Sequence, residues 1–183
     1  FTNSEYSVPL GEIELIDLLT DSNGKMNFEY LDNGSYADVA EGESILELND
    51  WYSLTAVYDG STIVLYLDGN YEAEVARTIT AQSAESSSFY LGRRRIGSNE
   101  NLNGYIRSAT LWDRALSSEE VASLSLGSYD QSDQSLVADW RINAGDGDKV
   151  FDHTGNRQRG DIIGADWAEY FTGCINQLAV NYI

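Results

Sequence analysis

Apolar and polar residues alternate along much of the chain with the period of two that is typical of β-strands. Residues 26–30, 44–48, 75–80 and 105–112 all show this alternation, and within residues 44–48 it predicts that Ile45 points inward. Clusters of Gly, Asn and Asp end these runs at intervals of about 8 to 12 residues. The pattern predicts an all-β chain of short antiparallel strands.

The clearest hairpin is the segment VYDGSTIVLYLDGN. Ile63, Leu65 and Leu67 share one face of its second strand, and an Asp-Gly pair closes each apolar run. Such pairs favour the tight turns that join antiparallel strands. We therefore interpret Asp59 and Asp68 as turn formers rather than as ligands.

One segment has the pattern of a short helix, around residues 117–124. Ser117 and Glu120 have the spacing of a capping box, in which each side chain hydrogen-bonds the backbone N–H of the other residue. Val121 and Leu124 would pack the helix against the body of the protein.

Five features follow one another across about half of the chain. They are Trp51 with residues 54–60, then residues 65–69, 91–92, 102–106 and 111–121. In combination they resemble a laminin G-like jelly-roll domain of the concanavalin A-like lectin/glucanase superfamily. The resemblance implies an antiparallel β-sandwich.

Residues 136–140 and 152–160 resemble the segment with which such domains usually open, although here they lie near the end of the sequence. Two arrangements are open. Either residues 1–183 form a single laminin G-like domain, or residues 1–127 end one repeat and residues 136–183 start a second. We favour the single domain, because the last segment is too short for another complete sandwich.

Charge limits the partners of this protein. The chain has 30 Asp and Glu residues against 11 Lys and Arg residues, a formal net charge of -19. This charge repels phosphate groups, so we expect no nucleic-acid partner. No apolar run is long enough for a membrane span. The sequon Asn33-Gly34-Ser35 predicts glycosylation of Asn33, and with it an extracellular or cell-surface location.

Calcium is the candidate cofactor. The family resemblance implies that Asp152 and Asn156, with the carbonyl groups between them, lie at a Ca²⁺ site, and hard cations do prefer carboxylate and carbonyl oxygens. The same residues, in the sequence Asp-His-Thr-Gly-Asn, also suit an Asx turn that needs no metal. The sequence leaves both interpretations open.

Sugar binding would need aromatic faces beside polar groups. Aromatic residues at alternating strand positions are also common core and cross-strand partners, so no single tyrosine is assigned to a ligand site. The candidates are Tyr30, Tyr36, Tyr66, Tyr71, Tyr90 and Tyr105.

The sequence gives little support for catalysis. With so many acidic residues, a suitably spaced pair is uninformative, and the Glu-x-Asp-x-x-Glu-like pattern of glycosidases with this fold is not seen. We predict a non-catalytic extracellular recognition module that binds a glycan or a protein, with Ca²⁺ as its candidate cofactor. The alternative is a structural or assembly subunit of a larger extracellular complex or fibre, with no small ligand.

Overall fold

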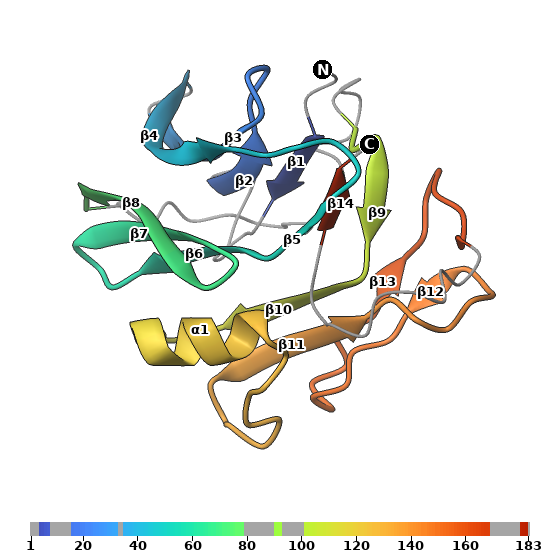
Figure 1. The fold of residues 1–183 in the computed structure, drawn as a ribbon. Coiled ribbons are helices and arrows are strands. Elements are labelled where there is room, and N and C mark those ends of the chain that lie inside the picture. The colour runs from blue at the N-terminus through green and yellow to red at the C-terminus, as the bar shows by residue number, and fades with distance from the viewer. Residues whose placement is uncertain are drawn as a thin grey trace.

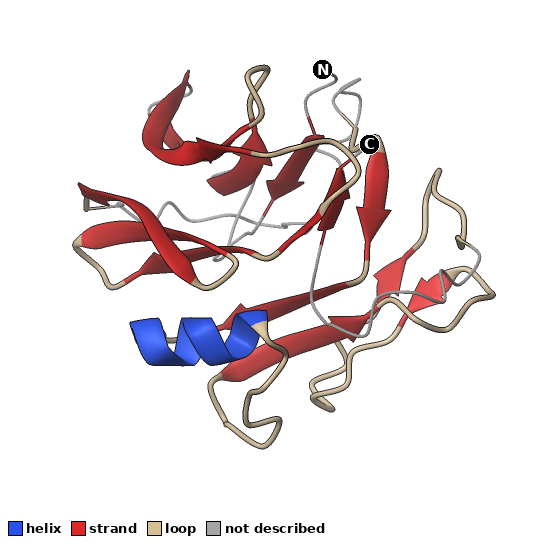
Figure 2. Ribbon diagram, viewed as in Figure 1, coloured by secondary structure: helices blue, strands red, loops and turns tan. Residues whose placement is uncertain are grey.

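The computed structural model of the chain describes residues 4–7, 16–32, 35–78, 90–92, 101–168 and 180–182. Within these residues the chain forms short strands and one helix, α1 (Figure 2). The elements of the first half are β1 (Ser4–Ser7), β2 (Ile16–Thr20), β3 (Lys25–Asp32), β4 (Ser35–Ile45), β5 (Trp51–Tyr52), β6 (Leu54–Tyr58), β7 (Thr62–Leu67) and β8 (Asn70–Ala76). Those of the second half are β9 (Gly104–Ile106), β10 (Ser108–Trp112), α1 (Ser118–Ser125), β11 (Leu136–Arg141), β12 (Lys149–Val150), β13 (Gly160–Asp161) and β14 (Val180–Tyr182). The predicted all-β class with one short helix is confirmed.

The strands are arranged in layers (Figure 1). Strands β1 to β4 form one antiparallel sheet in chain order, and β6 to β8 form a second. Helix α1 and the antiparallel pair β10–β11 lie on the other side of the second sheet. The β6–β8 sheet is therefore a middle layer.

Strand β7 is buried on both of its faces. Ile63 and Leu65 are fully buried against the β1–β4 sheet, where they join the core cluster of Leu18, Met26, Phe28 and Ala40. Val64 and Tyr66 alternate with them and pack towards α1, in a second cluster with Leu116, Val121 and Leu124. Burial on both faces explains why β7 reads as a continuous apolar run.

The prediction that Ile45 points inward is wrong. Ile45 is 61% exposed, whereas Leu46 is 3% exposed. The β3–β4 pairing shifts register between Lys25, opposite Ile45, and Asn27, opposite Glu41. This shift adds an even number of residues to β4, so the alternation continues through it: Ala40, Gly42 and Leu46 are buried, whereas Glu41, Glu43 and Ile45 are exposed. The apolar side chain of Ile45 suggested the wrong phase of this alternation.

The turn between β7 and β8 packs closely against α1. Asp68 and Gly69 both have positive φ angles, 52° and 79°. A Cβ atom on Gly69 would lie 2.6 Å from Ser125 Oγ and 2.9 Å from Ala122 Cα. Glycine is therefore needed at residue 69 both for the backbone conformation and for the close approach to the helix.

The predicted capping box is present at the start of α1. Ser117 Oγ accepts the Glu120 N–H at 3.3 Å, and Glu120 Oε2 accepts the Ser117 N–H at 2.8 Å. Val121 and Leu124 form the buried face of the helix. These contacts fix the path of the chain just before α1.

Two strands of the second half of the chain pair with strands that precede them. β11 lies beside β10, and β14 lies between β5 and β9. That residues 1–183 form a single domain, rather than parts of two repeats, stays a prediction. Among the residues that the structure describes, no helix is long and apolar enough to cross a membrane.

Candidate ligand-binding groove

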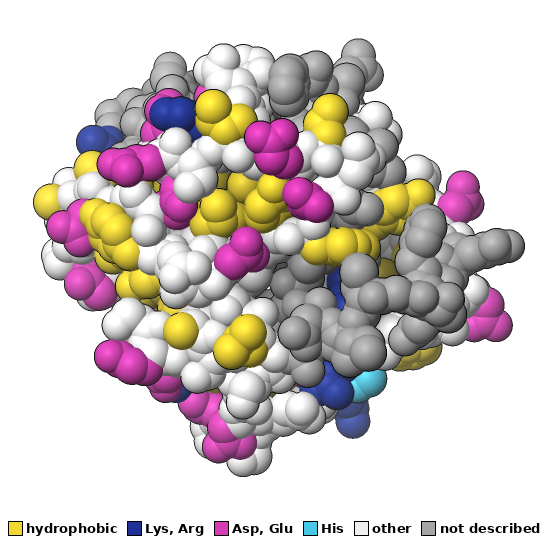
Figure 3. Space-filling view, in the orientation of Figure 1, with side chains coloured by type: hydrophobic (Ala, Val, Ile, Leu, Met, Phe, Trp, Pro, Cys, Tyr) yellow, Lys and Arg dark blue, Asp and Glu magenta, His cyan; other side chains and the backbone are white. Residues whose placement is uncertain are grey.

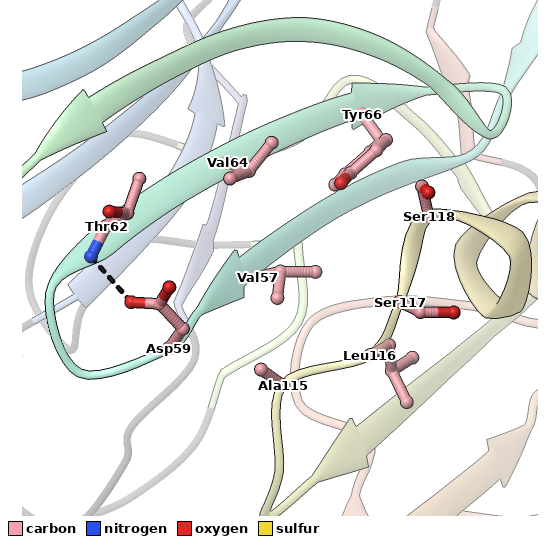
Figure 4. Close-up of a pocket in the computed structure, with 9 residues that line it drawn as sticks. All are labelled: Val57, Asp59, Thr62, Val64, Tyr66, Ala115, Leu116, Ser117 and Ser118. Atoms are coloured by element: carbon pink, nitrogen blue, oxygen red, sulfur yellow. Dashed lines mark hydrogen bonds between the residues drawn. The ribbon is translucent and has the colours of Figure 1, made fainter.

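A groove of about 430 Å³ opens between the β6–β7 hairpin and the segment that leads into α1 (Figure 4). One wall consists of residues from β6, β7 and their connecting turn, and the other consists of residues 115–118. Pockets for small ligands commonly measure about 300 to 1,000 Å³. The groove is therefore large enough for a sugar ring.

The walls of the groove are mainly apolar. Val57 and Val64 from the sheet lie across from Leu116, and the exposed Ala115 lies at the rim. Tyr66 belongs to the same wall but is 9% exposed, since its ring also packs in the core cluster beneath α1. These side chains give a sugar ring an apolar surface for its C–H groups.

Asp59 provides the negative charge of the groove. Its Oδ1 accepts the Ser61 N–H at 2.8 Å, the Ser61 hydroxyl at 2.9 Å and the Thr62 N–H at 2.7 Å. These hydrogen bonds lower the pKa of Asp59, so the carboxylate is ionised at neutral pH. All of them end on Oδ1, so within the described part of the chain Oδ2 stays available to a ligand.

The expectation that Asp59 is a turn former is confirmed, but its position in the groove was missed. The turn depends on local sequence, whereas the groove depends on residues 115–118, which are distant in the chain. Nothing in the alternation of the hairpin indicates which segment will cover its outer face. The groove could only be found from the packing of α1.

The groove combines the groups that sugar recognition uses. Asp59 can accept hydrogen bonds from sugar hydroxyl groups, and exposed Ser117 and Ser118 line the opposite wall. Among the described residues that line the groove, Asp59 is the one carboxylate. The pair of carboxylates that most glycoside hydrolases use is thus not assembled here.

The predicted calcium residues lie elsewhere, in a turn beside β11. Asp152 Oδ1 accepts the N–H groups of Asp139 at 3.1 Å and Thr154 at 3.0 Å, while Oδ2 accepts the Gln158 N–H at 3.1 Å. The Asn156 side-chain amide donates to the Val137 carbonyl at 2.9 Å. Burial raises the pKa of Asp152, but the hydrogen bonds outweigh it, so the pKa lies below its ordinary value.

This arrangement is an Asx turn fastened to β11, and it fits Ca²⁺ poorly. A cation would compete with the N–H groups that already point at both oxygens of Asp152. In the described ranges, no group of three or more His, Cys, Asp or Glu side chains is placed to hold a metal ion. Calcium binding at Asp152 and Asn156 stays a prediction.

The remaining predicted site residues are scattered. Asn33 lies outside the described residues, as do the side chains of Tyr30 and Tyr36. Tyr71 is 58% exposed on β8, and Tyr90 and Tyr105 are half-buried. Of the candidate tyrosines, Tyr66 is the one among the described groove-lining residues.

Comparisons with known proteins agree with this fold. Residues 10–122 match the family model of the concanavalin A-like lectin/glucanases superfamily. A crystal structure from Bacteroides ovatus, of a protein to which carbohydrate binding is ascribed, is similar with a TM-score of 0.62 at 17% identity. The similarity covers 91% of this chain and 54% of that one.

A second structure shows a weaker similarity. An S-layer domain-containing protein from Clostridium thermocellum has a TM-score of 0.38 at 26% identity, over 60% of this chain and 55% of that one. The chain thus spans about half the length of each of these two solved structures. No curated protein matches the sequence significantly. Because the family model covers more than half of its residues, the chain belongs to the concanavalin A-like lectin/glucanase superfamily.

Proposed function

We propose that the chain is a recognition module that binds a carbohydrate in the groove between the β6–β7 hairpin and residues 115–118. The observation that carries this proposal is the lining of the groove. An apolar wall, the ionised Asp59 and the exposed residues Ser117 and Ser118 border one cavity of about 430 Å³. The superfamily, and the activity ascribed to the Bacteroides ovatus protein, support the same class of ligand.

The proposed role is binding without hydrolysis, at an extracellular or cell-surface location. The superfamily includes both lectins and glucanases, so membership does not separate the two activities. Asp59 is the one carboxylate among the lining residues that the structure describes, and this favours binding because most glycoside hydrolases use two. A carbohydrate-binding module would encounter its ligand outside the cell. The strongly acidic composition would also keep the protein soluble there.

A glycan array, repeated with Ca²⁺ and with a chelator, tests the proposal. We expect at least one carbohydrate to be retained in both conditions, because Asp59 is the one carboxylate among the described lining residues and Ca²⁺ needs several oxygen ligands. Loss of binding on chelation would instead make calcium part of the site. No retention in either condition would refute carbohydrate binding and favour the alternative of an assembly subunit.

A further inference from the structure

The charge of the groove indicates which sugars it accepts. Asp59 is ionised and exposed, and it lines the same groove as residues 115–118. No Lys or Arg is found among the described residues that line the groove. Among the described lining residues, a ligand therefore meets the negative charge of Asp59 and no positive one.

The nearest basic residue in the sequence is already committed to other partners. Arg114 directly precedes Ala115 at the rim, but its guanidinium donates to Glu120 Oε1 at 2.7 Å and to Asp133 Oδ2 at 2.8 Å. It also lies over the ring of Trp112, 5.6 Å from the ring centre. A sugar carboxylate would have to break these contacts to pair with Arg114.

The field of the whole protein acts in the same direction. The formal net charge is -19, and acidic side chains are spread over the face shown in Figure 3. Such a field lowers the local concentration of anionic ligands and raises that of cationic ones. The charge of Asp59 and the net charge of the protein therefore both disfavour anionic ligands.

We propose that the groove prefers amino-bearing sugars to neutral ones and disfavours sugars that carry a carboxylate, such as uronic acids. This inference rests on the proposed function. The free Oδ2 of Asp59 accepts a hydrogen bond from a hydroxyl group and pairs more strongly with a sugar ammonium group. A uronate brings a second carboxylate to the same surface and is repelled.

Calorimetric titration of three matched oligosaccharides tests this selectivity. The probes are a neutral glucose oligomer, its glucosamine counterpart and its glucuronate counterpart, all with the same linkage. Asp59 is exposed, so we expect each step in the order amino, neutral, uronate to weaken binding by about two- to fivefold. The differences should shrink as salt is added.

A matched pair of variants separates the charge of the groove from the charge of the protein. Asp59→Asn keeps an Oδ1 acceptor for the turn while it removes the charge. Asp130→Asn does the same outside the groove, in an Asx turn where Asp130 Oδ1 accepts the Ser132 N–H at 2.8 Å and the Ser132 hydroxyl at 2.6 Å. Only Asp59→Asn should clearly reduce the preference for the amino sugar, down to the part that the field of the whole protein supplies.

Each outcome has a distinct meaning. The proposed selectivity is refuted if the wild-type protein binds the uronate as tightly as the neutral sugar. It is equally refuted if Asp59→Asn, folded with an unchanged melting temperature, keeps the amino preference undiminished. Failure of all three probes, together with a negative glycan array, would instead refute the proposed carbohydrate binding.

Discussion

At the scale of single residues, Gly69 combines two demands in one position. Gly69→Ala places a side chain at a φ of 79° and drives its Cβ to within 2.9 Å of Ala122 Cα. The left-handed backbone costs about 1–2 kcal/mol, and the overpacking adds about 1–3 kcal/mol. Urea unfolding should therefore show a loss of roughly 2–5 kcal/mol.

Gly60 provides the matched control, since it also has a positive φ, of 97°, but no atom would lie within 4 Å of an added Cβ. Gly60→Ala should cost only the backbone term of about 1–2 kcal/mol. Equal losses in the two variants would mean that the contact between the β7–β8 turn and α1 is not tight.

A variant of Asp152 distinguishes a structural turn from a calcium site. Asp152→Ala removes the acceptor of the Asp139, Thr154 and Gln158 N–H groups, so we expect a loss of roughly 1–2 kcal/mol. The loss should be the same in Ca²⁺ and in chelator. A melting temperature that rises with Ca²⁺ in the wild type but not in the variant would instead support the calcium site.

Residues whose role is local were predictable from the sequence. Asp59 formed the expected turn, and Ser117 and Glu120 formed the expected capping box. Ala115 gave no signal, because a small residue before a helix has no local signature of a binding site. Its position at the rim follows from how α1 packs on the middle sheet.

At the scale of elements, an ion-pair cluster links the start of α1 to the loop before β11. Arg114 pairs with Glu120 and Asp133, and its hydrogen bonds are the main cause that lowers the pKa of each carboxyl to about 2. Their ordinary values are 4.5 and 3.8. Because the folded pKa values are lower, the cluster stabilises the fold above those values and loses its effect as the pH falls towards 2.

Glu120→Gln tests this dependence without removing the capping box, which accepts Gln at the same position. Denaturant midpoints measured from pH 6 to pH 2 should fall less steeply for the variant than for the wild type. Parallel curves over this range would show that the ion pair adds nothing to stability, as is often found for exposed pairs.

The period-two pattern predicted strands well but gave less information about their faces. It found the β6–β7 hairpin, because turn chemistry and alternation agree there, but it placed the next strand at residues 75–80, whereas β8 spans Asn70–Ala76. It did not show that Val64 and Tyr66 would be covered by α1, since an apolar residue on an outer face reads the same whether a helix covers it or not. In β4, the apolar side chain of Ile45 suggested the wrong phase, because the buried positions of this segment are Ala40, Gly42 and Leu46.

At the scale of the whole molecule, the fold was predictable because family-like features recur in order along the chain, and residues 10–122 match the superfamily. The order of the strands was not predictable. β14 joins β5 and β9, which lie far earlier in the sequence, and such long-range pairing leaves no local pattern. The groove depends on the same long-range packing.

The central claim, that this groove binds the carbohydrate, is tested most directly by filling it. Ala115→Phe places a large side chain at the exposed rim, and Ala144→Phe makes the same change at an exposed position that does not line the groove. Calorimetry with the best carbohydrate from the array should show binding weakened at least about tenfold by Ala115→Phe, or about 1.4 kcal/mol. Ala144→Phe should bind as the wild type does, and equal affinity of all three proteins would contradict the account.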